Sequence, residues 1–336
     1  MTQTNAGAGA GPRRWPLLLA LLPLMLGLAV YGQLWRGWAA QFEATLASWF
    51  PGQKVVATGF PYRLESELSG VTLAHEGVVR LRASIAGLRL NRGPWRPELT
   101  VMQGEGLVLT ALVPGLSPRV TAAAGTASLK LDSDSRGQTR LARLSIVLPQ
   151  AQGGIGLAGE GPSFKADTLE LHAREMAPAA AGVASDPRLP QRGQLVINAD
   201  GLRIGQGAPI SLTGEAMARG RTRLLDWSRW ATGDGSVDLV ITGRDVTGEL
   251  FALDASLVPA GAGLRLAGSI RTVCPLAVQA ALAGAMPPIE SRLRVPVQLA
   301  IEAQLPAGTA VTVRGLPADL AARSRRAQLP PCPRLG

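Results

Sequence analysis

The sequence contains little of what metal centres are usually built from. Its 336 residues include only two histidines and two cysteines, and phenylalanine, tryptophan and tyrosine together make up 4%. A zinc centre needs three or four nitrogen, sulfur or carboxylate ligands at close spacing. Neither His75 nor His172 lies near a cysteine in the sequence. We therefore expect no metal site and no cofactor.

Lysine is also scarce, although the chain is basic. The formal charge is +10, yet only three of the 34 basic residues are lysines. A nucleic-acid-binding chain usually concentrates basic residues on one element and interleaves aromatic residues for stacking. Here the arginines alternate with apolar residues along predicted strands, as at Arg80, Arg82, Arg89, Arg92 and Arg96. We predict solvated strand faces and no nucleic-acid partner.

Motifs of common enzymes are missing as well. No GxSxG, P-loop or SxxK string occurs. "GIGLAG" at 154–159 fits a dinucleotide-binding string, but "EGPSF" follows where a helix should begin, so we interpret it as a β turn. "DSDSRG" at 132–137 lacks the closing glutamate of a calcium loop, and "HEGVVR" at 75–80 lacks a second histidine. We predict that the chain is not an enzyme; a hydrolase that uses carboxylates from distant segments is the third hypothesis.

What the sequence does contain is one long apolar run. Residues 15–32, "WPLLLALLPLMLGLAVYG", include no charged residue, and about 18 such residues match the hydrocarbon core of a bilayer. Arg13 and Arg14 precede the run, which places the N-terminus in the cytoplasm by the positive-inside rule. The sequence thus predicts a single-pass inner-membrane protein with its C-terminal domain in the periplasm. The candidate membrane-interface residues are Trp15, Tyr31, Trp35 and Trp38.

Two features around this run leave alternatives open. Gly27 and Ala29 have the spacing of a signal-peptidase site, so cleavage after Ala29 competes with a retained anchor. The apolar pattern then continues as an amphipathic helical extension that ends at Pro51. This face either packs on the downstream domain, which we favour, or lies in the membrane interface. Its residues are Leu34, Trp35, Trp38, Phe42, Leu46, Trp49 and Phe50.

The two cysteines fit an oxidising compartment such as the periplasm. Cys274 and Cys332 are candidates for one disulfide that ties the C-terminal segment to the body of the protein. Closing a loop of this length would stabilise the fold by about 4 kcal/mol.

Most of the remaining chain alternates apolar and polar residues with a period of two. In "GFPYRLESELSGVTL" at 59–73, Tyr62, Leu64, Ser66 and Leu68 fall on one face, and we expect Ser69 and Gly70 to turn the chain. The phrase Gly-Leu-x-Leu, or a variant of it, recurs, which we interpret as repeated hairpin construction. It begins at Gly70, Gly87, Gly106, Gly201 and Gly263.

These patterns predict a mainly β fold: a curved antiparallel sheet, or two, with a few short covering helices after an N-terminal transmembrane helix. The helices are expected at 216–232, 275–286 and 317–328. The predicted organisation is a disordered cytoplasmic N-terminus (1–14), a transmembrane helix with its amphipathic extension (15–50), a first β half (51–176), a linker or long loop (177–193), a second β half (194–315) and a basic C-terminal tail (316–336). The tail is either a solvated end, which we favour, or a patch for anionic lipid or polysaccharide.

The order of these features resembles a known family. The membrane segment, its tryptophan-containing extension, "GFPYRLESELSGVTL" and the later "GELFALDASLVPAGAGLRL" at 248–266 resemble domain-of-unknown-function family 2125 of bacterial envelope proteins. The chain is also similar in style to the β-rich AsmA-like envelope proteins. The resemblance implies no catalytic residues. We expect a non-catalytic envelope protein that binds a lipid or another amphipathic molecule; the alternative is an interaction scaffold that recruits envelope proteins through strand edges, the tryptophan-rich helix or the basic tail.

Overall fold

The fold is known from a computed structural model. It describes residues 15–76, 80–112, 117–133, 137–156, 163–176, 189–221, 230, 235–260, 263–305, 311–320 and 329–335, of which 15–20, 155, 156 and 305 are described by their backbone alone. The predicted disordered N-terminus at 1–14 lies outside these ranges, as do residues 177–188 of the predicted linker and 321–328 of the tail.

The described residues form two helices and 13 strands. The helices are α1 (Trp15–Trp49) and α3 (Pro275–Ala283). The strands are β1 (Leu64–His75), β2 (Arg80–Arg92), β3 (Leu99–Leu112), β4 (Ser117–Ser133), β5 (Thr139–Gly156), β6 (Ser163–Glu175), β7 (Gln191–Ile204), β8 (Ile210–Arg219), β9 (Ser236–Asp245), β10 (Gly248–Ala260), β11 (Gly263–Thr272), β12 (Val297–Leu305) and β13 (Thr312–Arg314).

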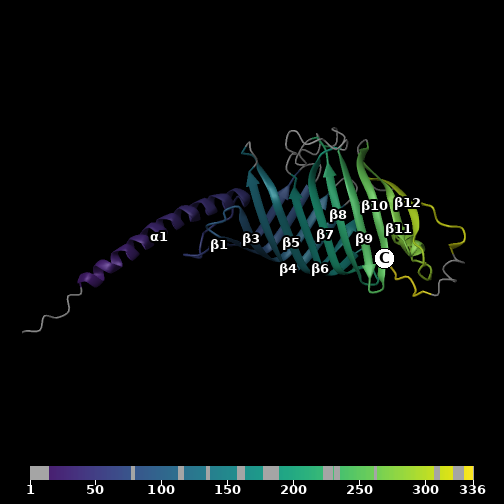
Figure 1. Ribbon diagram of the computed structural model, residues 1–336, viewed down its shortest axis with the longest axis horizontal. Helices are drawn as coiled ribbons and strands as arrows, with labels where there is room; N and C mark the ends of the chain where they lie inside the picture. The colour runs from purple at the N-terminus through teal and green to yellow at the C-terminus, as the bar shows by residue number, and fades with distance from the viewer. Residues whose placement is uncertain are drawn as a thin grey trace, which may run out of the picture.

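All described strands belong to one antiparallel sheet in which each strand pairs with the next along the chain. The prediction of a mainly β, antiparallel fold is confirmed. The sheet is open, with β1 and β13 at opposite ends of the strand order, and Figure 1 shows it twisting and curling while α1 projects away from the β1 end. β6 pairs directly with β7, so the sheet continues across the predicted linker, and residues 191–193 of that segment lie in β7.

The alternation in β1 sets the two faces of the sheet. Leu64, Ser66 and Leu68 are buried, whereas Glu67 is exposed, as the period of two predicts. Tyr62 departs from the prediction, because it precedes the strand and is 78% exposed. We call the face that carries Leu64 and Leu68 the inner face and the opposite one the outer face.

Glycines bend the strands instead of ending them. Gly70, Gly106 and Gly201 lie within β1, β3 and β7 and have φ of +61°, +58° and +60°. The prediction of hairpin turns at these glycines, and of a turn at Gly70 in particular, is wrong. At each one, two successive residues face outward before the alternation resumes, so that Leu68 and Val71 both face inward in β1.

These bends fall at one level of the sheet. In β5, Gln150 also has a positive φ, +51°. The registers on either side of the bends align Gly70 with Ala86 of β2, and align that residue in turn with Gly106 of β3. The left-handed residues therefore form a transverse line across the odd-numbered strands β1 to β7, which we call the crease.

Two of the three predicted helices differ from the structure or lie largely outside it. α3 confirms the helix expected at 275–286, with Pro275 in its first turn and Gly284 as a left-handed C-cap. The helix expected from 216 onward is wrong at its start, since residues 216–219 belong to β8, where they pair with β7 and β9. Residues 222–229 and 321–328 are outside the described part of the chain.

Candidate functional site on the inner face of the sheet

Two continuous rows of directly paired residues cross the inner face. Every member of each row is the registered partner of the next, so the side chains lie side by side on one surface. The first row is Ser66, Leu90, Met102, Ala127, Ile146, Leu171, Ile197, Gly214, Ile241, Leu253, Ile270 and Leu299. The second is Leu64, Arg92, Thr100, Leu129, Leu144, Ala173, Leu195, Ala216, Leu239, Ala255, Gly268 and Ile301.

The row between them on the outer face is mostly polar. It contains Ser128, Ser145, His172, Val196, Glu215, Val240, Asp254 and Ser269. His172 lies there with Nε2 3.4 Å from a carboxylate oxygen of Glu170. The sheet is therefore amphipathic along its whole width.

The first end of the inner face is covered by α1. Phe42, Leu46 and Phe50 of the helical extension are buried against Leu68, Leu88 and other residues of β1 and β2. Of the two uses considered for this extension, the structure shows packing on the sheet. Arg92 lies beneath the helix, so its prediction as a solvated residue is wrong: Nε and one terminal nitrogen donate to Thr100 Oγ1 at 3.1 and 3.0 Å, and its guanidinium lies 5.1 Å from the Phe42 ring.

The other end is covered by α3 and the C-terminal segment. Ala277 and Val278 of α3 are buried in the same cluster as Ile270, Ile301 and Leu335. The backbone carbonyl of Arg334 accepts a hydrogen bond from the Ala208 amide at 2.9 Å, which holds the segment against the β7–β8 connection.

Between these ends the apolar rows are only partly covered. In β5 to β9, Ile146, Leu171, Ile197 and Ile241 are half-buried, and Leu195 is 36% exposed. Neither α1 nor α3, the two helices that the structure describes, packs on this part. We call the members of the two rows in β4 to β9 the open apolar face, and it is the candidate binding site. Other inner-face residues of these strands, such as Leu148, Leu169 and Leu202, are buried in the cluster that includes α3.

An aromatic cluster lies where α1 meets the sheet. Three of the four predicted interface residues, Tyr31, Trp35 and Trp38, lie in it, and the fourth, Trp15, has no described side chain. Phe60 lies 5.3 Å from the Trp35 ring and Trp95 lies 5.1 Å from the Trp38 ring, centroid to centroid. Sequence reasoning missed both contributions; "GFPY" and "GPWRP" each place an aromatic residue beside proline, but nothing in their spacing links them to the helix.

Comparison with known proteins bears on these same regions. The family model described as "Uncharacterized protein conserved in bacteria (DUF2125)" matches residues 37–243, more than half of the chain. The chain belongs to this family. The DUF2125 match includes the buried part of α1, all of β1 to β8 and most of β9, and hence the open apolar face; α3 and both cysteines lie beyond it. No curated protein and no solved structure gives a significant match, so the similarity to AsmA-like proteins stays a prediction.

Outside the DUF2125 match, Cys274 and Cys332 form a disulfide with their Cα atoms 5.7 Å apart. Both sulfurs and a carboxylate oxygen of Glu290 lie within 4.8 Å of one another, but sulfurs bonded to each other are not available as thiolate ligands. Glu290 instead caps the N-terminus of α3, because its Oε1 accepts a hydrogen bond from the Ala277 amide at 2.9 Å. Burial raises the pKa of Glu290, although hydrogen bonds from the backbone amides of Ala277 and Leu276 oppose the shift.

A buried ion pair holds the adjacent segment. Arg292 donates from both terminal nitrogens to the carboxylate of Asp245, the last residue of β9 before the β9–β10 turn. Burial alone would raise the pKa of Asp245, but hydrogen bonds from Arg292 and Thr247 outweigh it and leave that pKa below its ordinary value. The pair links the turn to the chain that follows α3.

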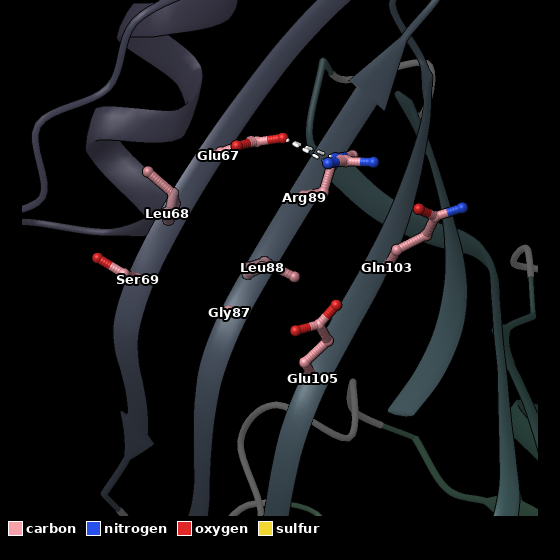
Figure 2. A pocket seen from close by; sticks show the side chains of 8 residues that line it. All are labelled: Glu67, Leu68, Ser69, Gly87, Leu88, Arg89, Gln103 and Glu105. Atoms are coloured by element: carbon pink, nitrogen blue, oxygen red, sulfur yellow. Dashed lines mark hydrogen bonds and ion pairs between the residues drawn. The ribbon is translucent and has the colours of Figure 1, made fainter. Parts of the chain in front are cut away.

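The outer face carries an open pocket of about 450 Å³ on the first three strands. Figure 2 shows Gly87, which has no side chain, between Ser69 and Glu105. Glu67 pairs with Arg89, with a carboxylate oxygen 2.7 Å from a terminal guanidinium nitrogen. The side chain of Glu67 is 70% exposed. The pocket is therefore lined by an exposed, arginine-paired carboxylate and by other polar side chains.

Over the described residues, no helix combines the length and the apolar character required to cross a membrane.

Proposed function

We propose that this protein is a non-catalytic, membrane-anchored protein of the bacterial envelope that binds the hydrocarbon part of a lipid or another amphipathic molecule on its open apolar face. The single observation that carries the proposal is the pair of apolar rows, which are covered at both ends of the sheet and only half-buried between them.

The dimensions of this face suit an acyl chain. Strands in a sheet are spaced about 4.8 Å apart, so β4 to β9 span roughly 24 Å. One leaflet of a bilayer core is about 15 Å deep, half of the ~30 Å hydrocarbon thickness. An acyl chain laid across these strands would therefore remain on apolar side chains, and each methylene removed from water stabilises the complex by about 0.8 kcal/mol.

The anchor rests on the sequence and on the shape of α1. Residues 15–32 carry no charge and follow Arg13 and Arg14, and α1 runs without interruption from Trp15 to Trp49. Along its described first half the apolar side chains face solvent, including Leu24, Met25 and Leu28 at 58, 64 and 53% exposure. An inner-membrane location with the sheet in the periplasm follows from the positive-inside rule.

Two neighbouring residues of β9 test the binding face. Ile241 lies on the inner face, between Gly214 and Leu253, whereas Val240 lies on the outer face, between Glu215 and Asp254. The full chain and each variant are purified gently from membranes, and the lipid per chain is measured by mass spectrometry of the organic extract. We expect Ile241→Asn to lower the co-purified lipid several-fold, because an amide is placed on the apolar surface.

The matched control is Val240→Asn, which makes the same kind of change on the wet side of the strand. It should retain the lipid content of the unmodified chain, with circular dichroism showing that both variants keep the sheet. Equal lipid content in the two variants would contradict binding on the inner face.

The free edge of β1 supports the second candidate, an interaction scaffold. Within the described ranges β1 pairs with β2 on one side and, on the other, only through the single bridge between Thr58 and Glu65. Such an edge can accept a strand from another protein. Crosslinking in cells from Thr72 of this edge, with a reproducible protein partner and no bound lipid, would favour the scaffold.

A further inference from the structure

Two loops at the α1 end of the sheet expose large aromatic side chains. Phe60 and Tyr62 precede β1, and Trp95 lies between β2 and β3; they are 55, 78 and 67% exposed. The aromatic fraction of the whole chain is only 4%, so this grouping of exposed rings is local. Tyrosine and tryptophan favour the headgroup level of a membrane, where the apolar body and the polar edge of the ring are both accommodated.

These loops are fixed to α1 at one level of the helix. Tyr31 donates a hydrogen bond from its hydroxyl to the Pro61 carbonyl, and its ring centroid lies 6.1 Å from that of Phe60 and 6.0 Å from that of Trp95. Trp35 lies one turn further along α1 and contacts Phe60. Trp38 lies two turns further along and contacts Trp95. The two loops therefore lie at the same depth relative to the bilayer as residues 31–38 of α1.

That depth is set by the anchor. A helix rises 1.5 Å per residue, so Tyr31 lies about 24 Å beyond Trp15, near the far edge of a ~30 Å hydrocarbon core. If residues 15–32 cross the bilayer, the loops that contact Tyr31 lie in the headgroup layer. The exposed apolar surface of α1 is thus continuous with the exposed rings of the loops.

Charge around the loops suits the same layer. Arg36, Arg63 and Arg96 are exposed beside the aromatic residues, against the acidic residues Glu65 and Glu98. Arginine side chains near a bilayer gain favourable interactions with anionic headgroups. The surface therefore combines rings and a small basic excess, as a membrane-facing surface requires.

We propose that the α1 end of the sheet is itself a membrane-docking surface, in which the loops at 59–63 and 93–96 insert Phe60, Tyr62 and Trp95 into the headgroup layer of the bilayer. The inference rests on the proposed membrane anchor and goes beyond it, since it places the sheet directly on the lipid surface. The open apolar face then begins at β4, the strand beside β3, whose preceding loop carries Trp95.

Nitroxide labels at three positions test the docking surface. Both native cysteines are joined in the disulfide, so a single introduced cysteine is the reactive one. The full chain is labelled at Tyr62→Cys, Val246→Cys or Leu24→Cys and reconstituted in vesicles of phosphatidylcholine and phosphatidylglycerol. Val246 is the matched control, because it is 103% exposed in the β9–β10 turn, far from β1 in the strand order.

The measurement is the collision rate of each label with oxygen, which concentrates in lipid, and with a water-soluble nickel chelate. We expect the label at position 62 to collide with the chelate several-fold less often than the label at 246, and to lie at headgroup depth. A label at 62 as accessible as that at 246, with the label at 24 in hydrocarbon, would overturn the docking surface but leave the anchor intact. A label at 24 in water would overturn the anchor and the docking surface together.

Discussion

At the scale of single residues, left-handed backbone positions decide how the sheet is built. For a residue with a side chain, this conformation costs about 1–2 kcal/mol, which is why three of the four crease positions are glycine. The crease allows seven long strands to bend at one level, and their pairing resumes in the same register on either side of the bend. It also shifts the alternation by one residue, so that apolar side chains remain on the inner face on both sides of the bend.

Alanine substitutions at three glycines distinguish the free-energy cost of a left-handed backbone from the cost of a steric clash. Gly106 has a φ of +58°, and a Cβ there would lie 2.9 Å from the Cβ of Ala86, which cannot swing away. Gly70 has a φ of +61° but no atom within 4 Å of a Cβ. We expect Gly106→Ala to lower the free energy of unfolding by about 2–3 kcal/mol and Gly70→Ala by about 1 kcal/mol, measured by chemical denaturation.

The control for both variants is Gly87→Ala. Its φ is ordinary, and the nearest atom to a Cβ would be 3.8 Å away, so the free energy of unfolding should stay within about 0.5 kcal/mol. Equal losses in all three variants would show that the crease places no special demand on its glycines.

Residue-level prediction from the sequence succeeded where one strand alone determines the environment. Leu64, Ser66 and Leu68 are buried as their alternation predicts. Arg92 was assigned to the wrong face because its burial depends on two distant partners, Thr100 in the next strand and Phe42 in α1. The sequence pattern within β2 does not indicate contacts with side chains of other elements.

At the scale of elements, the extension of α1 acts as a lid on one end of the inner face. Its apolar spacing was visible in the sequence, and Phe42, Leu46 and Phe50 are buried on β1 and β2 as expected for packing on the sheet. The helix predicted from 216 onward failed because Ala216 and Met217 favour helices in isolation, whereas pairing with two neighbouring strands decides the outcome here.

A pair of leucines in α1 measures the contribution of this lid. Leu46 is fully buried, at 0% exposure, whereas Leu34 is 51% exposed. Leu46→Ala should lower the free energy of unfolding of the sheet by about 2–5 kcal/mol, since it leaves a cavity in the α1 cluster. Leu34→Ala should change it by less than about 0.5 kcal/mol. A Leu46→Ala variant that unfolds like the unmodified chain would show that α1 does not hold the sheet.

At the scale of the whole molecule, the two apolar rows of one sheet are covered at both ends and half-buried in the middle, while much of the inner face near the crease is buried. The sequence predicts the fold class, because period-two alternation recurs from residue 64 to residue 305. It does not predict that the strands form one sheet in chain order, since pairing between successive hairpins leaves no mark in either strand alone. The open apolar face is hidden for the same reason: it appears only when the eleven registers from β1 to β12 are joined into rows.

The direct test of the account is the lipid content of the unmodified full chain, purified gently from the membranes in which it was made. The organic extract and the intact chain are both measured by mass spectrometry. The account predicts an uncleaved chain that begins before residue 15 and carries lipid at close to one molecule per chain. A chain free of extractable lipid would contradict binding on the open apolar face, and a mass beginning at Val30 would contradict the anchor.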